Sequence, residues 1–205
     1  SAIKALTDYY GFTTMINDSS DPRDVYHSIA IYDSKILQTD EFIDLFLNRI
    51  NKLGILNNTI IVLLSDHGDE FGEHGKFGHG QQLYEETIHV PLIIYNPRLK
   101  EGMKVKEQAQ LIDVMPTILD IIDIKIPKNI QGRSLLPLIN GNTKDFNKYA
   151  FATHSDVVAI RTNEWKLISR FNGSYELYNL FSDPRETINL VDERDDKFLE
   201  LKEKV

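Results

Sequence analysis

The pattern of apolar and polar residues predicts a long helix followed by a buried strand in the first part of the chain. From Arg23 to about Leu53, apolar residues recur at steps of three and four, which is typical of an amphipathic helix, one that could be interrupted near residues 38–40. Gly54 is placed to end this helix. The run Thr59–Leu64 is continuously apolar and rich in β-branched residues, which favours a central strand buried on both faces of a parallel sheet.

A second strand candidate and a second helix candidate follow. Val90–Tyr95 reads as a strand, with Pro91 at its start because proline cannot donate a hydrogen bond to a neighbouring strand. Residues 113–122 predict a helix with Asp113 as its N-cap, since Pro116 is tolerated only in a first turn. Helix, short turn and buried strand form the αβ half of a doubly wound unit, so the first part is predicted to be α/β with a parallel sheet.

The last third of the chain changes period and predicts a small antiparallel β subdomain with a C-terminal helix. The helix is expected over Glu193–Lys204, and residues 127–142 read as a connection. We therefore expect two domains, residues 1–142 and 143–205. Four short strands separated by turn residues suit a meander: Tyr149–Thr153, Val157–Thr162, Trp165–Arg170 and Tyr175–Leu180.

Candidate chemistry begins directly after the predicted central strand. Ligands of open α/β sheets bind outside the carboxyl ends of strands, and Asp66 and His67 lie at that end. A carboxylate beside an imidazole is half of a divalent-metal site. Gly68 is expected to permit a turn that lets the two side chains converge. The alternative is structural, with Asp66 as a helix cap and His67 as a packed ring.

The segment that follows, residues 69–80, combines acidic, histidine, lysine and glycine residues. It is too polar and too flexible for a core segment and too rich in reactive groups for a plain linker, so we interpret it as a functional loop. Within it, Glu70 and Glu73 are expected to shape the loop as hydrogen-bond acceptors.

Four short motifs in this part resemble the metal-site segment of the sulfatases, in the alkaline phosphatase superfamily. They are Ser65-Asp66-His67-Gly68, Gly72-Glu73-His74-Gly75, Leu83-Tyr84-Glu85-Glu86 and His89–Ile94. Asp113–Leu119, Gln131–Leu135 and Glu176–Leu180 extend the resemblance over nearly the whole chain, but only over the C-terminal half of the family. The resemblance implies an alkaline-phosphatase-like parallel sheet portion followed by the antiparallel subdomain.

The resemblance also implies roles for individual residues. Asp66 and His67 would be two ligands of a divalent metal ion, Ca, Mg, Mn or Zn. His79 lies where relatives commonly place an anion-binding lysine; it would hold or protonate the ester, or, as a neutral ring, ligate a second metal. Lys76 is expected to be a second anion contact or a solvated loop residue, and His74 to join the site or to make an internal hydrogen bond.

The nucleophile of the family is expected outside this chain. Sulfatases form a formylglycine from Cys or Ser in a Cys/Ser-x-Pro-x-Arg motif in their N-terminal half. This sequence has no cysteine, and neither residues 20–23 nor residues 182–185 have the required spacing. We therefore expect a fragment of a sulfuric ester hydrolase that is inactive alone and whose partner is the missing N-terminal half of the same polypeptide.

Two other functions stay open. Many sulfatases carry Asn where this chain has His67, and the Asp-His form resembles phosphonate monoester hydrolases, so a phosphoester or phosphonate hydrolase or a phosphoryl-head-group transferase is the first alternative. The second is a noncatalytic binding protein that retains the fold. In the hydrolase readings the substrate is a sulfate or phosphate ester, either a small molecule or a glycan.

The composition of the chain argues against nucleic acids as partners and against a membrane span. A formal net charge of −8 argues against a nucleic-acid binder, which needs a basic surface. No run of about eighteen apolar residues predicts a membrane span, and no signal peptide opens the chain, which slightly favours the cytoplasm in an otherwise unknown compartment. Association between copies stays open, because a truncated chain exposes core surface.

Overall fold

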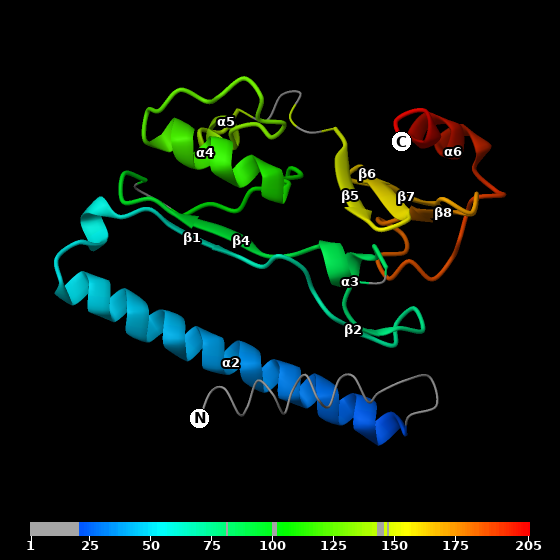
Figure 1. The fold of residues 1–205 in the computed structure, drawn as a ribbon, viewed down its shortest axis with the longest axis horizontal. Helices are drawn as coiled ribbons and strands as arrows, with labels where there is room; N and C mark the ends of the chain where they lie inside the picture. The colour runs from blue at the N-terminus through cyan, green and yellow to red at the C-terminus, as the bar shows by residue number, and fades with distance from the viewer. Residues whose placement is uncertain (1–20, 81, 100–101, 143–145, 147) are drawn as a thin grey trace. The chain divides into compact units, whose positions relative to one another are not determined.

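The computed structural model describes residues 21–80, 82–99, 102–142, 146 and 148–205 (Figure 1). The chain forms two compact units. Of the described residues, the first comprises 21–80 and 86–99, and the second comprises 82–85, 102–142, 146 and 148–205. The domain boundary at residue 142 that the sequence suggests stays a prediction.

The first unit contains the long helix α2, Pro22–Lys52. The Asp21 side chain caps its start, and Gly54 adopts a φ of 71° just beyond its end, as expected for a helix stop. The helix runs without interruption through residues 38–40, contrary to the break considered above. The Thr39 hydroxyl donates to the Lys35 carbonyl at 2.8 Å, so this polar stretch is accommodated inside the helical hydrogen-bond pattern.

A short 3₁₀ turn, η1 (Leu56–Asn58), leads into strand β1, Ile61–Leu64, which pairs with β4, Leu92–Tyr95. The two strands are antiparallel, with Ile61 opposite Tyr95, so the predicted parallel arrangement is wrong for this pair. β1 is also half-exposed and not buried on both faces. Within the described residues each strand has a single neighbour, and a two-stranded sheet leaves apolar side chains uncovered.

The predicted functional loop forms a small hairpin from β2, Glu70–Phe71, and β3, Phe77–Gly78. Gly72 and Gly75 take positive φ angles of 94° and 75° in its turn, a conformation in which a side chain would be strained. The Phe71 ring packs edge-to-face on Tyr32 of α2, with ring centroids 5.3 Å apart. The chain then passes through the short helix α3, Glu85–Ile88.

The second unit begins with η2 (Leu111–Asp113), α4 (Val114–Ile121) and, further along, α5 (Leu136–Ile139). Asp113 precedes α4 as predicted, but its carboxylate does not cap that helix. It accepts hydrogen bonds from the backbone N–H groups of Gln110 and Arg133, both at 2.9 Å. Asp113 therefore closes the η2 turn and holds the backbone at Arg133 against it.

The rest of the second unit is the predicted meander and terminal helix. The four strands pair in sequence order, each antiparallel to the next (Figure 1). A hydrophobic core of Ile160, Trp165, Leu167, Leu177 and Leu201 joins the sheet to the last helix. The elements are β5 (Ala150–His154), β6 (Val157–Arg161), β7 (Trp165–Arg170), β8 (Tyr175–Asn179) and α6 (Asp195–Lys202). In the described part of the chain, no helix combines the length and the apolar character that crossing a membrane requires.

Candidate functional site

Asp66 and His67 lie just beyond the end of β1, and both side chains are exposed. The Ser65 hydroxyl donates to the His67 carbonyl at 2.7 Å, which shapes the turn that follows the strand. Asp66 Oδ2 lies 3.7 Å from His67 Nε2, and the Asp66 side chain is 85% exposed. No helix starts at Asp66, and the His67 side chain is 45% exposed. The roles of these two residues stay predictions.

Gly68 is required in this turn for close packing of the chain. Its φ is not in the left-handed region. Its N–H donates to the Thr87 carbonyl at 2.9 Å, and a Cβ at this position would collide with the Glu86 carbonyl oxygen. The glycine thus lets the chain after Asp66 and His67 lie directly against the start of the segment that leads to β4.

The hairpin brings His79 against His67. Their rings are stacked, with centroids 4.4 Å apart and an interplanar angle of 29°. His79 Nδ1 lies 2.9 Å from Asp69 Oδ1, and His67 Nδ1 lies 3.0 Å from the Gly68 carbonyl oxygen. Both imidazoles are therefore oriented through Nδ1 by an oxygen atom.

These residues offer donors suited to a divalent cation. His67, Asp69 and His79 each present a ligand atom, and the three atoms lie within 4.8 Å of one another. Imidazole nitrogen and carboxylate oxygen are common ligands of Zn²⁺, Mn²⁺ and related ions. Asp66 is outside this group but contacts His67, so the chemistry of the local donor set fits the metal that the resemblance implies.

Asp69 is the residue that sequence reasoning did not single out. Its position two residues after His67 gave a weak signal, because alternate residues in extended chain project to the same side. Its contact with His79 depends on the hairpin that returns the chain ten residues later. Only the folded loop places these two groups together.

The remaining loop residues separate into different environments. His74 Nδ1 lies 2.6 Å from Glu86 Oε1 of α3 and the His74 side chain is only 12% exposed, so this ring makes an internal hydrogen bond. Glu73 accepts from the Phe71 N–H at 2.6 Å, in keeping with a loop-shaping role. Lys76 is exposed and makes no ion pair within the described residues.

Glu70 is the exception, because it is fully buried and neither carboxylate oxygen has a hydrogen-bond partner among the described residues. Burial raises the pKa of Glu70 from its ordinary 4.5 to about 7, and the nearby charges of Glu86 and Glu73 act in the same direction. The expected acceptor role is therefore wrong for Glu70. The structure instead holds a carboxyl group that favours its neutral form.

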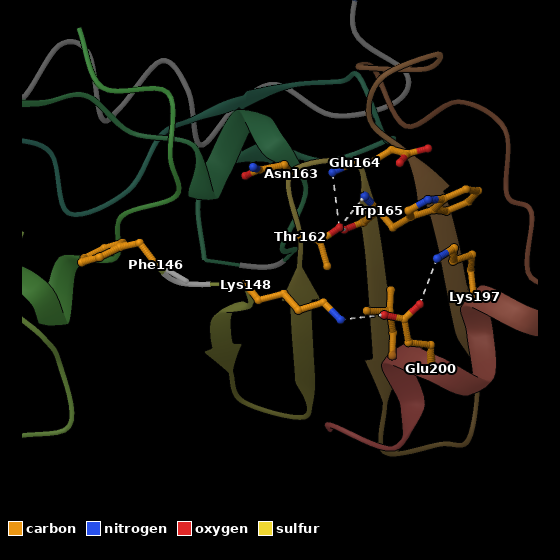
Figure 2. Close-up of a pocket in the computed structure, with 9 residues that line it drawn as sticks. Phe146, Lys148, Thr162, Asn163, Glu164, Trp165, Lys197 and Glu200 are labelled. Carbon is orange, nitrogen blue, oxygen red and sulfur yellow. Dashed lines mark hydrogen bonds and ion pairs between the residues drawn. The ribbon is translucent and has the colours of Figure 1, made fainter. Parts of the chain in front are cut away.

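A separate hollow of about 450 Å³ lies in the second unit (Figure 2). Lys148 and Lys197 both point toward Glu200, at 3.2 Å and 2.9 Å, so both ammonium groups share one carboxylate. None of the predicted site residues lines this hollow. Its lining comprises Phe146, Lys148, Thr162, Asn163, Glu164, Trp165, Lys197, Glu200 and Leu201.

Two family models match the chain and together cover almost all of it. The sulfatase model matches residues 4–124. The model described as N-sulphoglucosamine sulphohydrolase, C-terminal, matches residues 72–205. The two matches overlap in the region that contains His79.

Individual relatives agree with these matches. Human arylsulfatase K is 30% identical over 201 residues, which are 90% of this chain and 37% of the relative's length. The N-acetylglucosamine-6-O-sulfatase of Bacteroides thetaiotaomicron is 37% identical over 174 residues, 78% of this chain and 31% of that protein. The chain thus spans about a third of the length of these curated relatives.

Solved structures give the same result for the fold. A protein solved in complex with its substrate D-glucosamine-2-N,6-O-disulfate matches with a TM-score of 0.73 and 34% identity, over 88% of this chain and 40% of that one. The phosphonate monoester hydrolase of Silicibacter pomeroyi matches in fold, with a TM-score of 0.83 and 22% identity, over 96% of this chain and 46% of that one. The predicted α/β, alkaline-phosphatase-like fold class is confirmed. By its sequence matches and its fold, the chain belongs to the sulfatase family.

Proposed function

We propose that the intact protein is a metal-dependent hydrolase of sulfate esters and that this chain carries part of its metal and anion site. The observation that carries the proposal is the stacking of His79 on His67, next to Asp66, in a chain that belongs to the sulfatase family. This arrangement gathers a carboxylate and two imidazoles at the end of β1, which is where ligands of α/β sheets bind.

In this proposal Asp66 and His67 hold a divalent cation, which is Ca, Mg, Mn or Zn. A bound cation would act as a Lewis acid and lower the pKa of the nucleophile. Asp66 suits this role because its carboxylate is exposed. His67 suits it because its Nδ1 contacts the Gly68 carbonyl, so that Nε2 is the nitrogen whose lone pair can bind the metal.

His79 and Lys76 are proposed to bind the ester. The His79 ring is 40% exposed and has Nδ1 engaged by Asp69, so Nε2 is the nitrogen available to a sulfate oxygen or to the leaving alcohol. Lys76 adds an exposed ammonium group on the same hairpin. Charge-assisted hydrogen bonds from such donors are among the strongest that proteins make to anions.

The nucleophile and the substrate complete the proposal. The nucleophile is a formylglycine supplied by residues outside this chain, and the remainder of the polypeptide is the partner that brings it. The substrate is a sulfated sugar, since one relative is named for N-acetylglucosamine 6-O-sulfate and one matched structure holds a disulfated glucosamine.

The test is sulfate release by the protein encoded by the whole reading frame, assayed with 4-nitrophenyl sulfate and with glucosamine 6-sulfate in the presence of each cation. We expect Asp66→Ala and His67→Ala to lower kcat/KM by about 100-fold or more, since both are proposed metal ligands. His79→Ala should lower it on the order of 100-fold and Lys76→Ala less. The exposed His27, on α2, provides the matched control, and His27→Ala should leave kcat/KM unchanged. Wild-type activity in the Asp66→Ala protein would contradict the proposal.

A phosphate or phosphonate ester is the second candidate, and it rests on His67. The Asp-His pair resembles that of the phosphonate monoester hydrolases. Paired assays with 4-nitrophenyl sulfate and 4-nitrophenyl phenylphosphonate separate the two candidates, because both esters are monoanions with the same leaving group and differ in the central atom, sulfur or phosphorus. A kcat/KM that is higher for the phosphonate would move the assignment to phosphoryl chemistry. Binding of sulfated sugar without turnover of either ester would favour the noncatalytic alternative.

A further inference from the structure

We propose that Asp69 is a positioning residue that fixes the His79 ring so that Nε2, and not Nδ1, faces the ester. The inference rests on the proposed function, in which His79 meets the substrate. It assigns a role to a residue that neither the motifs nor the comparisons single out.

Asp69 and His79 form a close pair. Asp69 Oδ1 lies 2.9 Å from His79 Nδ1, a hydrogen-bond distance. An aspartate carboxylate near neutral pH is an acceptor only, so Nδ1 must carry the hydrogen in this contact. His79 Nε2 then faces away from Asp69 with no hydrogen-bond partner among the described residues. The Nδ1–H is present in both the neutral and the protonated ring, so the orientation is the same in both.

The two partners differ in exposure. The Asp69 side chain is 13% exposed, whereas the His79 side chain is 40% exposed. The carboxylate is therefore the anchored member of the pair and the imidazole is the accessible one. A buried anchor that holds an accessible ring is the arrangement expected of a positioning contact.

A further imidazole–carboxylate pair joins His74 of the loop to Glu86 of α3 and differs from the Asp69–His79 pair in exposure. The side chains of His74 and Glu86 are only 12% and 19% exposed, so the His74 ring is less accessible to solvent than the His79 ring. His79 also stacks on His67, whose own Nδ1 is held by the Gly68 carbonyl. Because Nδ1 is engaged in both the His67 and the His79 ring, the two Nε2 atoms are the nitrogens that can bind ligands. His67 Nε2 lies near Asp66.

The test is long-range ¹H–¹⁵N NMR of the 205-residue chain labelled at its six histidines, recorded above the pH range in which histidine titrates. We expect His79 to show a protonated Nδ1 and an unprotonated Nε2. Asp69→Ala should abolish this pattern and leave an averaged tautomer signal, whereas Asp69→Asn should retain it because the amide oxygen still accepts from Nδ1–H. Glu86→Ala is the matched control, and it should change the His74 signals alone.

A wild-type His79 with the hydrogen on Nε2 overturns the proposal, and this measurement needs no variant to fold. An unchanged His79 pattern in Asp69→Ala overturns it as well, because the contact would then be only structural. Adding sodium sulfate separates this inference from the proposed function. The sulfate titration is recorded below the pH range in which histidine titrates, because only a protonated Nε2 can donate a hydrogen bond to the anion. Sulfate that shifts His79 Nε2 there supports both, whereas an intact tautomer pattern without any response to sulfate supports the positioning and counts against the anion-binding role.

Discussion

At the scale of single residues, Glu70 shows how far the site loop departs from what residue type predicts. A glutamate in a polar loop is normally solvated, but the Glu70 side chain is fully buried. Glu70 lies opposite Gly78 in the β2–β3 hairpin, and its carboxylate has no hydrogen-bond donor among the described residues. Burial raises its pKa to about 7, and the negative charges of Glu86 and Glu73 add to this effect. The neutral acid is thus favoured at mildly acidic pH, and ionisation costs stability.

This pKa predicts a defined pH dependence of stability. Because the folded-state pKa is raised, the contribution of Glu70 is fully present below its unfolded value of 4.5 and is lost as the pH rises toward about 7. We expect Glu70→Gln to gain stability relative to wild type over that window, on the order of 3 kcal/mol, with a constant difference above it. Urea unfolding followed across this pH range measures the difference. A difference that does not change with pH would show that Glu70 ionises freely in the folded protein.

At the scale of elements, the second unit holds its short segment 82–85 to the meander through buried charges. Lys166 on β7 is fully buried, with Nζ 2.8 Å from Glu186 and 3.3 Å from Glu85. Arg161 on β6 adds a 3.0 Å contact to Glu85. Buried ions must be paired, so Glu85, which lies in one of the sequence motifs, stabilises the second unit through these ion pairs.

Removing the central cation should be costly. Lys166→Met leaves Glu85 and Glu186 without their shared partner, and we expect a loss of about 3 to 5 kcal/mol in the free energy of unfolding. Lys148→Met is the matched control, because Lys148 is 68% exposed and its contact with Glu200 lies on the surface (Figure 2); it should cost less than about 1 kcal/mol. Urea unfolding of both variants at neutral pH measures these losses in the free energy of unfolding. Equal losses in the two variants would refute the buried-pair explanation.

At the scale of the whole molecule, burial is divided unevenly between the two units. Of the described apolar residues that are fully enclosed, only Ile50 belongs to the first unit, whereas the second unit encloses a continuous cluster. In the first unit, β1 and β4 stay partly exposed. Regions with few buried contacts open at lower free energy than a packed core.

Amide hydrogen exchange followed by mass spectrometry should show this difference directly. We expect amides in β6, β7 and β8 to exchange on the order of tenfold or more slowly than those in β1 and β4. The β2–β3 hairpin, with its two-residue strands, provides a fast-exchanging reference in the same sample. Equal protection of β1 and β7 would mean that the first unit is as stable as the second.

The sequence by itself determined the longer helices and strands of this chain, its family and the positions of its reactive residues. The reason is that periodicity, caps and motifs are local. The sequence did not predict the short elements β2, β3 and α5, and α5 lies in the segment that was read as a connection. The α2 helix, its stop at Gly54 and all four strands of the meander were predictable to within about two residues at each end. Asp66, His67 and His79 were identifiable from the motifs that contain them, and their roles stay predictions.

Only the tertiary structure decided how these elements pair and which side chains meet. The antiparallel register of β1 and β4, the contact of Asp69 with His79 and the burial of Glu70 all depend on contacts between residues distant in sequence. The same apolar run can pair in either direction, since pairing is set by neighbours and not by composition. The charges of Glu85 and Lys166 likewise became a buried pair because residues 82–85 and β7 pack together, 81 positions apart along the chain.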